Sequence, residues 1–310
     1  MMEKEIHDLI NEQMLSWDLA KQNYSGLKQV KTKEFTINQT TYKVQFNPAR
    51  ILSSNAKVDS QSIRERKCFL CKENLPNTQR GLLFEDKYQL LVNPYPIFPK
   101  HLTIPDLNHT DQRIAGRFID MLNLAEALEE FVIFYNGPKC GASAPDHAHF
   151  QAGNKGFLPI ENDWKKLEKE EIKTVENATL WELRDSPRAT LVIEATAKQA
   201  ANNLFELVYS SLDHLSNEEE PMMNIVTWKE KERWITCIFP RKQHRPSCFF
   251  SENADHLLIS PASVDMGGVF ITPQEEDFEK IDADAIAKIL QEVCFSATDL
   301  LKIKQNIQSI

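Results

Sequence analysis

The chain has 310 residues, which is enough for one large domain or two of ordinary size. Its formal charge is −9, from 36 Lys and Arg against 45 Asp and Glu, and no block of basic residues dominates any segment. This balance disfavours nucleic-acid binding over a broad basic surface, so a phosphate ligand has to be held by a few local cations.

Targeting and membrane signals are not found in the sequence. The first residues carry no apolar signal core, and no run of 18 apolar residues occurs. We therefore expect a soluble, cytoplasmic chain without a membrane partner. Its six cysteines are few for this length, and reduced thiols or metal ligands are expected rather than disulfides.

The first half of the chain is expected to alternate between helices and short strands. In chain order we predict a helix over 4–24, a hairpin of 35–38 with 41–46, one or two strands over 82–92, a strand over 101–104, a helix from about 111 and a strand over 131–135. The proline-rich segment 93–99 must be a loop, because proline cannot continue a helix.

The second half repeats this kind of pattern. After a charged helix or connector over 160–178, we predict a strand over 190–194, a helix over 197–215, a hairpin of 222–228 with 233–239, and a last helix over 284–307. The expected class is α+β, with largely antiparallel sheets and helices packed on one side. The recurrence suggests two degenerate halves, a catalytic one over 1–160 and a second over 161–310 that contributes to substrate binding.

The most informative motif is the segment 140–151, where His147, His149 and Gln151 follow a turn of small residues. In a strand, alternate side chains point to the same face, so these three side chains are expected to project together. A neutral imidazole can attack phosphorus, and an amide can hydrogen-bond phosphoryl oxygens without supplying a proton. The motif therefore favours nucleotidyl transfer through a histidine-bound intermediate.

Ser-x-Pro followed by His-x-His-x-Gln resembles the active-site strand of the histidine-triad superfamily, in its transferase branch. That branch includes galactose-1-phosphate uridylyltransferase, diadenosine tetraphosphate phosphorylase and the GDP-hexose phosphorylases. The segments 146–152 and 260–268 resemble the GDP-galactose phosphorylases, and segment 260–268 is still more similar to an uncharacterised bacterial family of the same superfamily. The resemblance implies a histidine-triad-like antiparallel sheet.

The resemblance also implies roles for the motif residues. His149 matches the nucleophile that becomes nucleotidylated, and Gln151 matches the position of a third histidine in the hydrolases. Because an amide cannot act as a general acid, glutamine favours transfer to a phosphate acceptor over hydrolysis. One residue departs from the uridylyltransferase pattern: Asp146 lies between the proline and the first histidine, which shifts the expected phosphate contact of Ser143 by one position.

Another resemblance implies a structural zinc site. In the uridylyltransferases a similar Cys-Phe-Leu-Cys turn supplies two zinc ligands, which here are Cys68 and Cys71. A histidine in a proline-flanked run supplies the third, matched by His101, and the first histidine of the motif, His147, supplies the fourth. The alternative is that both cysteines are packed thiols and that His101 binds a phosphate or a backbone group.

The remaining candidate residues are expected to hold substrate phosphates or the ribose. By resemblance, Arg50 grips phosphate oxygens, Asn93 lies near the ribose and Asn136 lies near the leaving group. Arg241 and Arg245 concentrate positive charge in an acidic chain and suit an anionic acceptor. The alternative for Arg50 is a solvated arginine at a strand end, and for Arg241 and Arg245 it is an exposed basic loop.

Together, these features predict that the chain is a two-step nucleotidyltransferase or phosphorylase that acts on a nucleoside-diphosphate sugar or a dinucleotide. Phosphate or a sugar phosphate is the expected acceptor, and the chain is expected to be a monomer or a homodimer. Two alternatives stay open at this point. One is a histidine-triad hydrolase, and the other is a nucleotide-binding sensor without catalytic activity.

Overall fold

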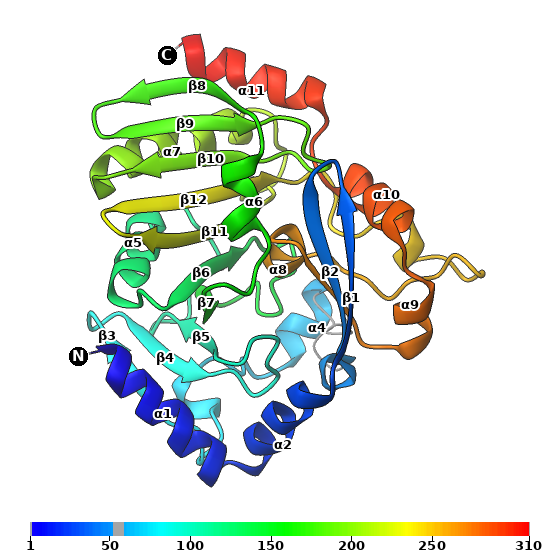
Figure 1. The fold of residues 1–310 in the computed structure, drawn as a ribbon. Coiled ribbons are helices and arrows are strands. Elements are labelled where there is room, and N and C mark those ends of the chain that lie inside the picture. The colour runs from blue at the N-terminus through cyan, green and yellow to red at the C-terminus, as the bar shows by residue number, and fades with distance from the viewer. Residues whose placement is uncertain (1, 52–58, 310) are drawn as a thin grey trace.

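Ten strands form one antiparallel sheet in the computed structural model, which describes residues 2–51 and 59–309 (Figure 1). The strand order is β3-β4-β5-β7-β6-β11-β12-β10-β9-β8. The first five in this order are β3 (Gly81–Phe84), β4 (Tyr88–Val92), β5 (His101–Pro105), β7 (His149–Asn154) and β6 (Phe131–Asn136). The second five are β11 (Met223–Glu230), β12 (Arg233–Pro240), β10 (Leu191–Ala195), β9 (Ala178–Leu183) and β8 (Lys169–Val175). The predicted α+β class is confirmed.

The two sets of five strands have the same internal order. Counted from the outer edge inward, the first set runs 3-4-5-7-6 and the second runs 8-9-10-12-11, so β6 and β11 meet at the junction. Each set also has one helix between its third and fourth strands along the chain, α5 (Phe118–Ala127) and α7 (Lys198–Asp213). The repeated order is consistent with two degenerate halves, while the boundary at residue 160 stays a prediction.

Helices α5 and α7 cover the same face of the sheet. Their rings Phe118 and Phe205 stack with centroids 4.1 Å apart, and both side chains are fully buried. The central strand β6 is buried at every position, which explains why its sequence is a continuous apolar run rather than an alternating one.

A smaller sheet of three strands joins the two ends of the chain. The hairpin β1 (Lys31–Ile37) and β2 (Thr40–Phe46), which agrees with the prediction, pairs through β2 with the parallel strand β13 (Val269–Thr272). Short helices α6 (Ile160–Lys166) and α9 (Glu275–Lys280) contact β2, and α8 (Ser263–Met266) leads into β13. The C-terminal segment is thereby brought beside strands of the first half (Figure 1).

Four expected elements differ from the structure. The N-terminal helix is interrupted at Trp17, whose extended backbone separates α1 (Met2–Ser16) from α2 (Asp18–Gly26). Residues 160–178 form α6 and the edge strand β8, and the helix expected from residue 111 begins only at Phe118. The last helix is split into α10 (Ala283–Val293) and α11 (Ala297–Ser309).

The split between α10 and α11 has a visible cause. Cys294 is extended and forms a bridge with Arg241, and backbone bonds from Lys242 to Val293 and from Phe295 to Pro240 flank it. Pairing with the end of β12 therefore outweighs helix continuation. Along the described ranges, 2–51 and 59–309, no helix has the length and apolar character needed to cross a bilayer.

The packing of β7 against the proline-rich loop yields a stability prediction. A Cβ atom on Gly153 would lie 2.4 Å from ring atoms of Phe98, a fully buried side chain. Gly153→Ala should therefore lower the free energy of unfolding by about 1–3 kcal/mol. Urea unfolding followed by circular dichroism measures it.

The matched control is Gly26→Ala, at the end of α2, where no atom lies within 4 Å of the added methyl group. Its free energy of unfolding should stay within about 0.5 kcal/mol of the wild type or rise slightly. If Gly153→Ala proves as stable as this control, the described contact between Phe98 and β7 is wrong.

Candidate functional site

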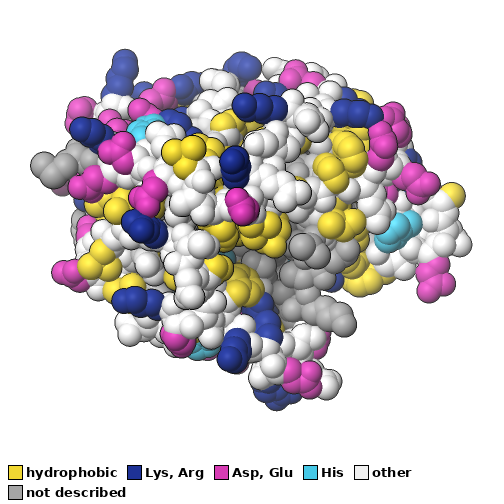
Figure 2. Space-filling view, turned by 90° about the horizontal axis from the view of Figure 1, so that it is seen from below, with side chains coloured by type: hydrophobic (Ala, Val, Ile, Leu, Met, Phe, Trp, Pro, Cys, Tyr) yellow, Lys and Arg dark blue, Asp and Glu magenta, His cyan; other side chains and the backbone are white. Residues whose placement is uncertain are grey.

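A cavity of about 500 Å³ lies where β6 ends and β7 begins, with walls from both halves of the chain. Seven of the predicted site residues line it: His149, Gln151, Arg50, Asn93, Asn136, Ser143 and Arg245. Seen from below, one face of the molecule is hollowed near its centre, and hydrophobic side chains gather beside the hollow (Figure 2). The structure thus collects most of the predicted substrate and catalytic positions in one place.

The motif strand begins at His149, two residues later than the sequence suggests. His149 and Gln151 alternate along β7 and both line the cavity. His147 precedes the strand in a bend, does not line the cavity and directs its ring toward the cysteines. The expectation that all three side chains share one face is therefore wrong for His147, because alternation holds only within the strand.

His149 is held as a neutral imidazole with one nitrogen available. Its Nδ1 lies 2.8 Å from the carbonyl oxygen of His147, so Nδ1–H donates there and Nε2 carries the lone pair. Burial lowers the pKa of His149 to about 4, which keeps the ring unprotonated at neutral pH. The arrangement leaves Nε2 able to act as a nucleophile.

The amide of Gln151 is oriented by His101. The backbone N–H of Ile97 donates to Nδ1 of His101 at 3.2 Å, so His101 carries its proton on Nε2 and donates to Oε1 of Gln151 at 3.1 Å. Burial lowers the pKa of His101 to about 3, which is consistent with this neutral form. Because Oε1 is engaged, the NH₂ group of Gln151 is the end left for a ligand.

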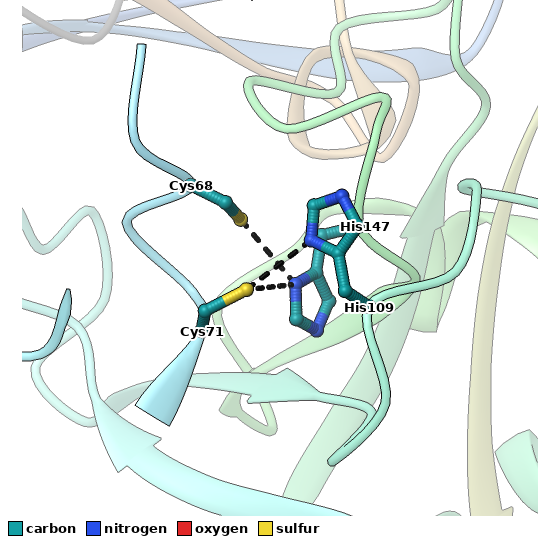
Figure 3. Close-up of side chains that lie close together, drawn as sticks. All are labelled: Cys68, Cys71, His109 and His147. Atoms are coloured by element: carbon teal, nitrogen blue, oxygen red, sulfur yellow. Dashed lines mark hydrogen bonds between the residues drawn. The ribbon is translucent and has the colours of Figure 1, made fainter. Parts of the chain in front are cut away.

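Four side chains form a cluster that can hold a metal ion (Figure 3). Cys68 Sγ lies 3.3 Å from His147 Nδ1, and Cys71 Sγ lies 3.2 Å from His109 Nδ1 and 3.6 Å from His147 Nδ1. Tetrahedral bonds of about 2.3 Å to sulfur and about 2.0 Å to nitrogen separate neighbouring S and N ligand atoms by about 3.5 Å. The cluster therefore has the spacing of a tetrahedral Cys₂His₂ site.

His101 does not belong to this cluster, so the prediction that it completes the set with the two cysteines is wrong. His101 starts β5 and pairs with Gly153, four residues along β7 from His149. Four strand residues span about 13 Å. Since β5 and β7 are antiparallel, only residues that follow β5 lie near residues that precede β7, and His109 is such a residue.

The signal that identifies His109 is therefore its place after the strand rather than the proline-flanked run before it. Pro105, the last residue of β5, pairs with His149, the first residue of β7. The chain then reaches His109 within four residues, and the ring of His109 lies 5.1 Å from that of His147. Without the strand pairing, the sequence does not distinguish His109 from His101 as the fourth member of the cluster.

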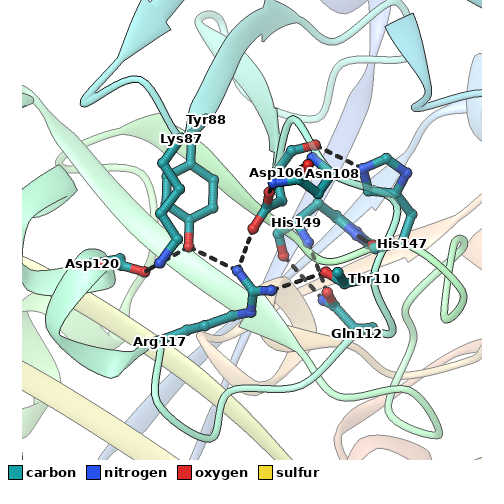
Figure 4. Close-up of polar contacts among 10 residues, drawn as sticks. All are labelled: Lys87, Tyr88, Asp106, Asn108, Thr110, Gln112, Arg117, Asp120, His147 and His149. Atoms are coloured by element: carbon teal, nitrogen blue, oxygen red, sulfur yellow. Dashed lines mark hydrogen bonds and ion pairs between the residues drawn. The ribbon is translucent and has the colours of Figure 1, made fainter.

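Residues of the loop 106–117 form hydrogen bonds with both motif histidines, His147 and His149 (Figure 4). Nε2 of His147 donates to the carbonyl oxygen of Asp106 at 2.8 Å, which leaves its Nδ1 free to face the cysteines. Gln112 accepts from the backbone N–H of His149 at 2.7 Å and donates to the carbonyls of His149 and Asn136 at 3.0 and 2.9 Å. The three backbone segments that meet at the cavity are thus joined by one side chain.

The loop is itself anchored by a partly buried ion pair. Arg117 pairs with the carboxylate of Asp106 and donates to Thr110 at 2.9 Å and to the hydroxyl of Tyr88 at 3.3 Å. Tyr88 in turn donates to Asp120 at 2.7 Å. This network connects the loop with β4 and α5, so the positions of the histidines depend on the packed sheet and not on the loop alone.

Asp146, the residue that departs from the family pattern, has a defined partner. Its carboxylate accepts from Arg66 at 2.7 Å, and Arg66 also donates to the carbonyl oxygen of Ser143 at 3.2 Å. The other oxygen of Asp146 lies 4.0 Å from Nε2 of His109. The added residue therefore joins the segment before the cysteines to the turn before His147.

Arg241 does not reach the cavity, and the prediction that it binds substrate is wrong. Its side chain is 1% exposed, and all five of its N–H groups donate to protein oxygens. Four of these acceptors are backbone carbonyls, and the fifth is Oδ1 of Asn224 at 2.6 Å. No N–H is left for a phosphate, although the residue type and its basic surroundings suggested one.

The cavity also contains charged and titratable residues that the sequence analysis did not single out. Asp265 accepts from the backbone N–H of Ala262 at 2.8 Å, and burial raises the pKa of its carboxyl to about 6. His244 adjoins Arg245 in the wall, and burial lowers the pKa of His244 to about 4.

Arg245, a predicted substrate-binding residue, donates through Nε to Ser260 at 3.1 Å and lies over the ring of Phe249.

Much of the cavity wall is apolar, and part of it comes from the N-terminal helices. Its apolar side chains include Trp17, Leu19, Leu70, Leu75, Leu91 and Ile97. Trp17 is 7% exposed, and none of the hydrogen bonds among the described residues uses its indole N–H. An apolar wall with one unused donor suits a flat heteroaromatic ring. The break between α1 and α2 puts Trp17 in this wall, which a continuous helix did not predict.

Comparison with known proteins agrees with this geometry. Residues 9–154 match a family model described as a domain of unknown function, DUF4922, and residues 164–310 match one described as "GDPGP1-like, C-terminal domain". The chain is 23% identical over 312 aligned positions to diadenosine 5′,5‴-P1,P4-tetraphosphate phosphorylase 2 of Saccharomyces cerevisiae, covering 92% of each protein. These matches support the resemblance to the transferase branch of the histidine-triad superfamily.

Solved structures share this fold. The yeast Ap4A phosphorylase Apa2 in complex with AMP superposes with a TM-score of 0.65 at 20% identity, covering 96% of this chain and 97% of that one. The same enzyme in complex with Ap4A gives a TM-score of 0.62 at 19% identity, covering 95% and 97%. The likeness extends over both halves, so this chain shares the fold of that enzyme over nearly its full length.

Proposed function

We propose that this chain is a phosphorylase of dinucleoside polyphosphates that works through a nucleotidyl-histidine intermediate at His149. The observation that carries the proposal is the neutral imidazole of His149, whose Nδ1–H is engaged and whose Nε2 is available in a cavity of about 500 Å³. That volume suits one nucleotide with its phosphates. The likeness to a dinucleotide phosphorylase over 92% of both chains supports the substrate class.

The proposed reaction has two displacements at the same phosphorus. In the first, Nε2 of His149 forms a bond to the α-phosphorus, and the P–O bond to the remaining polyphosphate breaks with its electron pair on the leaving oxygen. In the second, an oxygen of inorganic phosphate forms the new P–O bond, and the P–N bond breaks with its pair returned to Nε2. The products are a nucleoside diphosphate and the released nucleotide.

Gln151 is proposed to favour phosphate over water as acceptor. The donor to its Oε1 is His101, so its NH₂ group faces the phosphoryl oxygens, to which it donates without being able to transfer a proton. A water nucleophile needs a group that removes its proton, whereas phosphate already carries a negative oxygen. Arg50 and Arg245 are proposed to neutralise the polyphosphate, and a nucleoside-diphosphate sugar is the second candidate substrate.

We further propose that the cluster holds a structural zinc ion. Cys68, Cys71, His109 and His147 would fill all four positions, so the ion would join the cysteine turn to the two loops beside β7. Bound there, zinc would supply cross-linking rather than chemistry, since no position is left for a substrate. The Nε2–H of His147 donates to Asp106, which supports metal binding through Nδ1.

The zinc proposal predicts a clear difference between two histidines. The wild type should bind about one zinc per chain, and His109→Ala should lose it with a fall in thermal midpoint, because a structural site contributes folding energy. His101→Ala should keep the metal, since His101 bonds to Gln151 instead. Elemental analysis of the purified proteins measures the content. Zinc retained in His109→Ala but absent from His101→Ala would contradict the proposed ligand set.

The function is tested with dinucleoside polyphosphates and nucleoside-diphosphate sugars, each with and without phosphate. The wild type should consume at least one dinucleotide and release a nucleoside diphosphate only when phosphate is present. His149→Ala should lose on the order of 10⁴-fold or more in turnover, because the covalent route is removed. Product masses are the readout.

The outcomes separate the proposal from its alternatives. A nucleoside monophosphate formed at equal rates with and without phosphate indicates a hydrolase. Binding without any turnover, and without a covalent nucleotidyl adduct in the intact protein mass, indicates a sensor. Full turnover in a folded His149→Ala variant would overturn the proposed nucleophile.

The nucleobase is proposed to lie against Trp17 in the apolar part of the cavity wall. ADP should therefore quench the tryptophan fluorescence of the wild type. In Trp17→Phe the quenching should disappear. Binding should weaken about 3- to 10-fold, because the hydrogen bond that the indole N–H donates to the base is lost. Trp181→Phe, which changes a tryptophan outside the cavity, should keep both. Quenching that persists in Trp17→Phe would place the base elsewhere.

A further inference from the structure

Arg241 lies at the centre of a buried polar cluster that joins the second half to the cavity. Its Nη1 donates to Oδ1 of Asn224 at 2.6 Å and to the carbonyl of Pro261 at 3.0 Å. Asn224 is fully buried, and its Nδ2 lies 3.1 Å from Oδ1 of Asn136, 2.8 Å from the carbonyl of Cys140 and 3.3 Å from Oγ of Ser263. Because Oδ1 of Asn224 accepts from a guanidinium, its amide cannot flip.

The sheet register aligns this cluster with the proposed nucleophile. Asn224 on β11 pairs with Asn136 on β6. Phe134 on β6 pairs with Gln151 on β7, and continuing that register by two residues places Asn136 opposite His149. Residues opposite each other in antiparallel strands point to the same face. Asn224, Asn136 and His149 therefore form one row across three neighbouring strands.

The row leaves Asn136 with one possible orientation. Its Oδ1 accepts from Nδ2 of Asn224 and from the backbone N–H of Ser263 at 2.8 Å. A backbone N–H can only donate, so the atom that faces Ser263 must be the oxygen. Asn136 lines the cavity, and its Nδ2 makes no hydrogen bond within the part of the chain that the structure describes. The amide donors are thus held toward the cavity, beside His149.

We propose that Asn224 and Arg241 are positioning residues of the second half, which hold the Asn136 amide so that it donates to the phosphoryl group in transfer. Negative charge builds on the oxygens of that group as the bonds to His149 and the leaving oxygen exchange. Donors that are already oriented stabilise this charge without reorganisation. The inference rests on the proposed function of His149. It gives Arg241 a role at a distance from the substrate, in place of the direct contact expected from the sequence.

The test begins with Asn224→Asp, which keeps the shape and the bond from Arg241 but replaces the donor to Asn136 with an acceptor. We expect kcat to fall on the order of 10- to 100-fold while KM rises about threefold, because the lost interaction is stronger in the transition state than in the bound ground state. If this variant does not fold, the neutral change Asn224→Ser takes its place in every comparison.

The control is Thr227→Val on the same strand. Thr227 is fully buried and its hydroxyl lies 2.8 Å from that of Thr236, away from the cavity. Its loss should lower the thermal midpoint to a similar extent but leave kcat within about twofold. Equal loss of kcat in Thr227→Val and the Asn224 variant would reduce the role of Asn224 to general stability and overturn the proposal.

A double-mutant cycle decides whether Asn224 acts through Asn136. In an Asn136→Ala background, the Asn224 change should reduce kcat by less than about twofold further. If it reduces kcat by its full factor there, or leaves kcat unchanged in the wild-type background, the proposal is wrong. Arg241→Lys, which cannot make five hydrogen bonds, should behave like the Asn224 variant in both backgrounds.

A binding readout separates this inference from the proposed function. AMP binding is measured by calorimetry in the same variants, and both Asn136→Ala and the Asn224 variant should weaken it by about threefold or more, without additivity. If the wild type binds AMP but transfers nothing, the proposed function is wrong. The AMP affinities of the single and double variants then still test whether Asn224 acts through Asn136. If the wild type neither binds AMP nor transfers, both are overturned.

Discussion

The antiparallel pairing of β6 with β11 is the constraint on which the rest of the structure depends. It joins two five-stranded sets of the same order into one sheet. It also sets side chains of the second half in line with β7, where His149 lies. Without this pairing the cavity would lose one wall, and the buried polar groups behind Asn136 would have no partners. The second half is therefore part of the site and not an appended domain.

Burial determines the chemistry at the centre of this sheet. The low-dielectric surroundings penalise the protonated form of His149 and of His101, and both rings are neutral as a result. Each neutral ring is then fixed by one hydrogen bond that selects its tautomer, from His149 to the carbonyl of His147 and from Ile97 to His101. A single physical effect thus leaves an unprotonated imidazole at His149 and an oriented amide at Gln151.

The four side chains of the cysteine and histidine cluster do not line the cavity. His147 and His149 are two residues apart, yet one faces Cys68 and the other faces the substrate cavity. This division arises because the strand begins between them, so one residue follows the geometry of a bend and the other that of a strand. A cluster that can hold a metal ion and a cavity lined by an available imidazole can therefore share a short segment.

How far the sequence predicts the site depends on the range of the interaction involved. His149, Gln151, Asn136, Arg50 and Arg245 were placed in the cavity by local motifs, and the hairpins and central strands followed from apolar patterns. Such features depend on neighbouring residues, whose spacing the sequence states directly.

By itself, therefore, the sequence determined the fold class, the motif strand and the cysteine pair. Only the tertiary structure decided that His109 rather than His101 completes the cluster, that Trp17 enters the cavity wall, and that Arg241 is enclosed by protein oxygens. The physical reason is that strand direction and register bring together residues far apart in the chain. A residue type reveals which bonds it can make, but only packing determines which partners are within reach.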